Sequence, residues 1–129
     1  MIRSIAAILF FLSTSLFAQK PESFSDFQFK FFSDSTFQTI RTQFPLLKIS
    51  LNLQNFRHDS TFIYEWNFVD FGFIRQNYYI EVRDNFHRES RSNERVVSFI
   101  GIETGLNVSL FFSRIKGEWF FVKWINEST

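Results

Sequence analysis

The first hydrophobic pattern along the chain is an apolar segment that follows a single positive charge. Arg3 precedes a predominantly apolar run over residues 5–17, and the run ends at the small residue Ala18. The run has about thirteen residues, whereas a membrane-spanning helix needs roughly 20. A charged start, a short apolar segment and a small residue at its end are typical of an export signal. We therefore expect residues 1–18 to be a signal peptide and residues 19–129 to form one exported domain, periplasmic or secreted, without a membrane span.

A helical hydrophobic period begins the expected mature domain. Four phenylalanines recur at helical spacing within residues 23–33: Phe24, Phe27, Phe31 and Phe32. Ser23 and Asp26 occupy the positions of a capping box, which favours a helix that begins here. Phe27, Phe29 and Phe31 also alternate, so a strand is the competing interpretation.

The pattern predicts a second helix directly afterwards. Ser35 and Gln38 fit another capping box, and Phe37 and Ile40 then lie on one side of the helix. Pro45 ends this helix, because proline pushes the residue before it toward the extended conformation.

From residue 46 the hydrophobic period changes to that of a strand. Four aliphatic residues alternate with polar ones: Leu47, Ile49, Leu51 and Leu53. Residues 61–71 also alternate, but they are so rich in apolar side chains that a buried helix is an open alternative. Residues 78–83 predict another strand. The charged residues 84–94 predict a solvated hairpin loop.

The last third of the chain predicts an antiparallel meander. Its strands cover residues 96–102, 107–115 and 118–125, and a tight turn at Lys116 and Gly117 joins the last two. Helices followed by a run of strands indicate the α+β class rather than a parallel α/β fold.

The final strand carries apolar side chains on both faces of the predicted sheet. Simple alternation places one set on one face and another set on the other: Trp119, Phe121 and Ile125 against Phe120, Val122 and Trp124. Helices cover one face of such a sheet, and a large exposed apolar surface marks an interface. We therefore expect a homodimer through the outer sheet face, or contact with an envelope protein.

Composition narrows the class of protein. The chain has no cysteine, so it has no disulfide, and we do not expect a lipoprotein. With 21 phenylalanines, we expect apolar packing to stabilise the domain. Loss of residues 1–18 removes Arg3, one of 14 basic residues, and leaves 13 basic against 13 acidic residues. This balance disfavours nucleic-acid binding, which requires a basic surface.

Two segments carry a family resemblance. They are the spaced residues Phe37-Gln38, Arg41 and Phe44-Pro45, and the run over residues 112–122 with its Lys-Gly turn and tryptophan. Together they resemble an uncharacterised family of exported bacterial domains, domain of unknown function 4348, of the nuclear-transport-factor-2-like or cystatin-like superfamily. The resemblance covers residues 22–126 and implies N-terminal helices packed in the hollow of a curved antiparallel sheet, a cone. Enzymes of this superfamily place their catalytic groups inside the cone, and no such set can be matched here.

Six residues are candidates for ligand binding: Gln38, Arg41, Tyr64, Trp66, Tyr78 and Trp119. The guanidinium of Arg41 could bind an anion through two hydrogen bonds. Alternatively it pairs with Asp34, Glu65 or Asp70 and ties helix to sheet. The aromatic candidates, together with Trp124, either line an apolar pocket with donors at its mouth or fill the core.

No pattern identifies a catalytic residue, a cofactor or a metal site. His58 falls in a predicted polar turn and His87 in the charged loop, without converging ligands. We therefore expect a non-enzymatic exported binding or interaction domain for a small apolar ligand or a partner. The alternative is a small isomerase or hydrolase that uses Asp70 with Tyr64 or Arg41 inside the cone.

Overall fold

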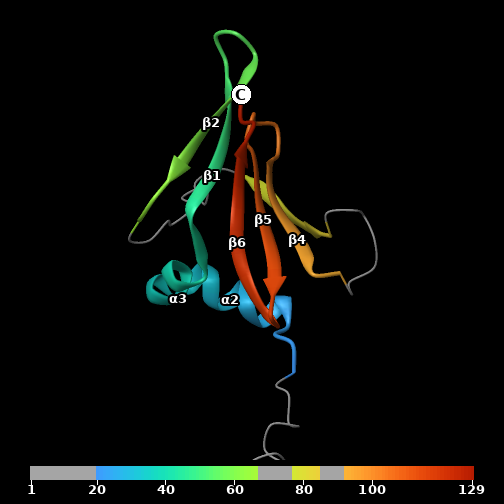
Figure 1. Ribbon diagram of the computed structural model, residues 1–129. Helices are drawn as coiled ribbons and strands as arrows, with labels where there is room; N and C mark the ends of the chain where they lie inside the picture. Colours follow the sequence, from blue (N-terminus) through green and yellow to red (C-terminus); the bar gives the residue numbers. More distant parts are fainter. Residues whose placement is uncertain (1–19, 67–76, 85–91) are drawn as a thin grey trace, which may run out of the picture.

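A computed structural model describes residues 20–66, 77–84 and 92–129 of the chain. Two helices and six strands follow one another in these residues: α2 Phe24–Ser33, α3 Ser35–Ile40, β1 Thr42–Asn52, β2 Arg57–Ile63, β3 Tyr78–Arg83, β4 Glu94–Gly101, β5 Asn107–Ile115 and β6 Glu118–Asn126. The strands form one curved sheet, and both helices lie at one end of it (Figure 1). The predicted α+β class is confirmed. The predicted signal peptide lies outside the described residues.

Both predicted helices form, and the start of the second differs by one residue. The Ser23 hydroxyl accepts a hydrogen bond from the Asp26 amide at 3.2 Å, as the first capping box predicts. The second helix is capped by Asp34 instead of Ser35, because Asp34 is extended and its Oδ1 accepts from the Phe37 amide at 3.0 Å. Asp34 also ends α2, since its amide donates to the Lys30 carbonyl. One residue therefore closes the first helix and begins the second.

The sheet has the strand order β2-β1-β6-β5-β4-β3. Strands β3 to β6 form the predicted antiparallel meander, with antiparallel pairing at each step. The expectation of an entirely antiparallel sheet is wrong at one place, because β1 runs parallel to β6. Both strands start at the helix end of the sheet, where the Phe121 amide donates to the Arg41 carbonyl at 2.8 Å. Their common starting point sets their common direction.

The boundaries of β1 and β2 differ from the sequence prediction. Strand β1 begins at Thr42 and includes Pro45, and its pairing with β6 shifts register between Thr42 and Leu47. This irregularity accommodates proline, which has no amide hydrogen for the ladder. The segment predicted at 61–71 is a strand that starts at Arg57 and ends at Ile63, and residues 67–76 lie outside the described part. His58 therefore lies in β2, opposite Leu51, and the predicted polar turn is wrong.

A β-bulge in β6 changes which face its last residues occupy. Phe121 pairs with Phe112 and Lys123 with Phe111, so Val122 is an extra residue without a partner on β5. Beyond the bulge, Trp124 lies on the same face as Phe121. The sequence pattern predicted Trp124 on the other face of the sheet from Phe121, and Ile125 on the same face as Phe121. This prediction is wrong, because an inserted residue reverses the alternation beyond it.

The core is built from aromatic rings at the helix end of the sheet. Phe27 and Phe31 of α2 pack on Phe112 with ring centroids 5.5 and 5.2 Å away, and Phe112 packs on Phe121 at 5.3 Å. Trp119 lies among them and is completely buried. Rings therefore fill the hollow beneath the helices. Within the described residues, no helix has the length and apolarity needed to cross a membrane.

Candidate functional site

The six predicted ligand-binding residues fall into two groups. Gln38, Arg41 and Trp119 lie where the helices meet the start of β6, whereas Trp66 and Tyr78 lie among aromatic side chains elsewhere and Tyr64 is 71% exposed. The structure thus brings together three of the six and separates them from the others.

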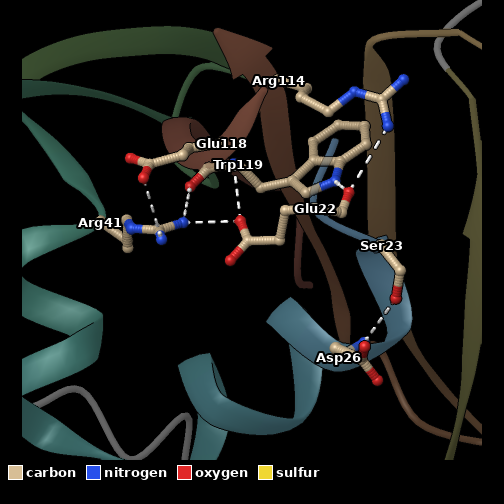
Figure 2. Close-up of polar contacts among 7 residues, drawn as sticks. All are labelled: Glu22, Ser23, Asp26, Arg41, Arg114, Glu118 and Trp119. Carbon is tan, nitrogen blue, oxygen red and sulfur yellow. Dashed lines mark hydrogen bonds and ion pairs between the residues drawn. The ribbon is translucent and has the colours of Figure 1, made fainter. Parts of the chain in front are cut away.

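Arg41 is held by a carboxylate that the sequence did not reveal. Figure 2 shows the Glu22 side chain between Arg41 and the backbone of Trp119. Glu22 Oε1 accepts from Arg41 Nη1 at 2.6 Å and from the Trp119 amide at 2.9 Å. Arg41 also donates to the Trp119 carbonyl at 3.1 Å and lies 3.8 Å from Glu118. This network ties helix to sheet, as one interpretation of Arg41 predicted.

The partners of Arg41 differ from those expected. Among the described residues its ion pairs are with Glu22 and Glu118, and neither Asp34 nor Glu65 takes part. Asp70, the third expected partner, lies outside the described residues. The Arg41 guanidinium also lies 4.8 Å above the Phe37 ring. These contacts cover the side chain, and binding of a ligand anion by Arg41 stays a prediction.

Trp119 is the centre of the same network. Its indole Nε1 donates to the Glu22 carbonyl at 2.9 Å, and Arg114 donates to that oxygen at 3.4 Å (Figure 2). The guanidinium groups of Arg95 and Arg114 each lie 5.2 Å from the Trp119 ring. Burial lowers the pKa of Arg95, the nearby charge of Arg114 lowers it further, and Asp84 opposes both effects. The Trp119 donor is thus used inside the protein.

Gln38 links the two helices. It is completely buried, and its Nε2 donates to the Phe31 carbonyl at 3.2 Å. Its own carbonyl accepts from the Thr42 hydroxyl at 2.7 Å. Gln38 therefore contributes to the connection between α2, α3 and β1.

Trp66 belongs to a second aromatic group, which we call the aromatic wall: Phe44, Trp66, Phe121 and Trp124. The Trp66 ring lies 5.1 Å from Phe44, 5.8 Å from Phe121 and 6.4 Å from Trp124. Trp66 Nε1 is buried, and no described residue accepts a hydrogen bond from it. Lys48 places its ammonium 4.6 Å from the Trp124 ring centroid. The wall thus combines apolar surface, an indole donor and a nearby positive charge.

A solved structure shares this architecture. It is an NTF2-like protein from Bacteroides fragilis NCTC 9343, with a TM-score of 0.63 and 19% sequence identity, over 86% of this chain and 49% of that one. The fold of this chain is NTF2-like. At this identity the similarity establishes the architecture alone, and the chain spans about half the length of the B. fragilis protein. No family model and no curated protein matches the sequence.

The remaining titratable candidates do not converge in the described part of this NTF2-like fold. His58 Nε2 lies 3.1 Å from Glu127 Oε1 at the surface, and His87 lies outside the described residues. Within residues 20–66, 77–84 and 92–129, no group of acidic or histidine side chains could hold a metal ion. Tyr78 packs on Phe99 with ring centroids 5.8 Å apart.

Sequence reasoning missed Glu22, which accepts hydrogen bonds from both Arg41 and Trp119. The only local signal is its position directly before the helix cap Ser23. Its partner Trp119 is 97 positions away in the chain. Only the packing of the N-terminal segment against the turn between β5 and β6, where the Glu22 amide donates to the Gly117 carbonyl, brings them together.

Proposed function

We propose that this protein is an exported, non-enzymatic binding domain that holds a small apolar ligand against the aromatic wall. The observation that carries the proposal is the buried Nε1 of Trp66, which donates to no described residue. A buried donor without a hydrogen-bond partner destabilises the folded protein. Such donors therefore bond to another protein group, to water or to a ligand. A ligand with an apolar body and one acceptor oxygen fits this surface, and the Lys48 ammonium beside Trp124 favours a carboxylate as that acceptor.

The filled hollow supports binding over the alternative of a cone enzyme. Phe27, Phe31 and Phe112 occupy the space beneath the helices where catalytic groups would meet a substrate. Arg41, one residue of the enzyme hypothesis, is paired with Glu22. Tyr64 faces solvent, and Asp70 lies outside the described residues.

Export and family membership are parts of the same proposal. The charged start and apolar run of residues 1–18 support export, and a core that needs no disulfide suits either the periplasm or the exterior. The two segments that resemble domain of unknown function 4348 support placement in that uncharacterised family. The outer face of the sheet exposes apolar side chains such as Phe62, which supports the predicted homodimer. Light scattering over micromolar concentrations tests it.

Binding of decanoate to the purified protein tests the proposed ligand site. Decanoate has an apolar body and a carboxylate, and decanol is the matched probe without charge. The Trp66→Phe variant keeps an aromatic ring, loses the indole donor and loses a little apolar surface, so we expect at least five- to tenfold weaker binding, of which roughly this amount is the equivalent of one hydrogen bond. Tyr64→Phe, at an exposed position outside the wall, is the control and should bind as the parent does.

Isothermal titration gives the dissociation constants. Equal affinity of Trp66→Phe and the parent protein would refute the role of Nε1. Absence of saturable binding by both decanoate and decanol at millimolar concentration would refute an apolar ligand site at the wall.

A further inference from the structure

A hollow of about 250 Å³ lies on the face of the sheet opposite the helices. It crosses four neighbouring strands, and its lining includes Leu47 of β1, Val122 and Lys123 of β6, Phe111 of β5 and Glu94 of β4. Phe111 precedes the core residue Phe112 along β5, so its side chain points away from the helices. The hollow is therefore separate from the aromatic wall, and it does not rest on the function proposed above.

Two breaks in strand pairing meet at this hollow. The register between β1 and β6 shifts between Thr42 and Leu47, and the register between β5 and β6 shifts between Phe111 and Phe112. Strand β6 carries the bulge residue Val122 at the same level. Bulges bend a strand and disrupt the ladder locally, and they are common beside binding sites. The hollow is thus built into the sheet and is not a gap between loose surface side chains.

Two opposite charges lie along the hollow, and neither has an ionic partner among the described residues. Glu94 lies on the β4 rim, and its Oε2 is buried with no hydrogen-bond partner in the part of the chain that the structure describes. Lys123 lies on β6, half-buried, with its ammonium 4.2 Å from the Phe111 ring centroid. Among the described residues no ion pair involves either side chain. A buried oxygen without a donor is costly, and a cation or N–H group at this rim relieves that cost.

The spacing of the charges defines the kind of molecule that fits. Glu94 and Lys123 are two strands apart and two residues out of register, which separates their Cα atoms by roughly 10–12 Å. Phe111 of β5 provides apolar surface between them, and Val122 of β6 and Leu47 of β1 extend this surface on the far side of Lys123. Nearby Arg95 is not a third free charge, because it donates to the Ser92 carbonyl at 2.8 Å and stacks on Trp119.

We propose that this hollow binds a small linear zwitterion, with an ammonium at Glu94, a carboxylate at Lys123 and an aliphatic chain on the apolar surface of Phe111. The two oxygens of Glu94 exchange places by rotation about the terminal torsion, so the orphaned oxygen can reach the ligand. An ω-amino acid of about eight carbons separates its two charges by up to roughly the distance between the Glu94 and Lys123 Cα atoms, and its flexible chain can shorten to match the charged groups.

Titration with 8-aminooctanoate tests the proposal on the purified protein, with octylamine and octanoate as probes of each single charge. We expect saturable binding of 8-aminooctanoate, and about tenfold or greater weakening in each of Glu94→Gln and Lys123→Gln, since each removes a charge-assisted contact. Glu94→Gln should weaken octylamine and spare octanoate, and Lys123→Gln should do the reverse. Glu81→Gln, a half-exposed carboxylate on β3, is the matched control and should bind like the parent.

Far-UV circular dichroism of each variant establishes that it is folded, and Val122→Trp provides an independent test by filling the hollow. Loss of 8-aminooctanoate binding in a folded Val122→Trp protein supports the site. Unchanged affinity in this variant, or in Glu94→Gln and Lys123→Gln together, overturns the proposal. Absence of saturable binding to the parent protein up to millimolar ligand overturns it as well.

Discussion

Replacement of Glu22 by alanine should destabilise the protein more than the same replacement of an exposed glutamate such as Glu118. The substitution removes the acceptor of two hydrogen bonds, one from Arg41 at 2.6 Å and one from the Trp119 amide at 2.9 Å. It leaves Arg41, whose side chain is 13% exposed, with the Trp119 carbonyl and the more exposed carboxylate of Glu118, and it leaves the Trp119 backbone N–H without this acceptor.

The magnitude follows from these two losses. A hydrogen bond to a charged group contributes about 1.5–3 kcal/mol, and an orphaned donor costs about 1–3 kcal/mol. Because the Glu22 side chain is 21% exposed, solvent screens its interaction with Arg41. The contribution of this charged hydrogen bond is therefore expected near the lower end of its range. We expect a loss of roughly 2–4 kcal/mol in the free energy of unfolding, or a fall of roughly 9–17 °C in the melting temperature for a domain of this size.

Urea denaturation at pH 7, followed by tryptophan fluorescence, measures this loss. Glu118→Ala is the matched control, because Glu118 is 57% exposed and lies 3.8 Å from the same guanidinium. It should change stability by less than about 1 kcal/mol. A double-mutant cycle of Glu22→Ala with Arg41→Ala should give a coupling energy of about 1 kcal/mol or more. Equal effects of Glu22→Ala and Glu118→Ala would refute the structural role of Glu22 and favour a ligand-binding role for Arg41.

Two further substitution pairs test the helices. Phe31→Ala removes a fully buried ring and should cost about 3–5 kcal/mol, whereas Phe29→Ala on the same helix, at a site 76% exposed, should stay within about 0.5 kcal/mol. Similar losses from both, in thermal unfolding, would mean that α2 packs through another face. Asp34→Ala should cost about 1 kcal/mol because Asp34 caps α3, and Ser35→Ala should cost less. A larger loss of stability from Ser35→Ala than from Asp34→Ala would mean that Ser35 is the cap.

Local features were predictable because neighbours in sequence determine them. The capping pair Ser23 and Asp26 and the 3.6-residue period identified α2, and the alternation of β5 together with the turn at Gly117 identified the final hairpin. Both turn residues have positive φ, 51° at Lys116 and 82° at Gly117, as a two-residue hairpin turn requires.

The candidate site was only partly predictable. Arg41 and Trp119 were recognised as residues of interest from their types and positions, but the carboxylate that joins them was not. Trp66 was named for its aromatic character, yet the absence of an acceptor for its Nε1 among the described residues depends on where Phe44 and Trp124 lie around it. Such properties arise from packing between distant segments and leave no local pattern.

The sequence by itself determined the α+β class, the two helices, the final meander and an aromatic core, since each depends on local period, capping and composition. Only the tertiary structure decided that β1 lies parallel to β6, that Val122 forms a bulge and turns Trp124 toward the core, and that Glu22 joins Arg41 to Trp119. The physical reason is the same in each case. Pairing register and ion-pair partners depend on which segments meet in space, and these segments are far apart along the chain.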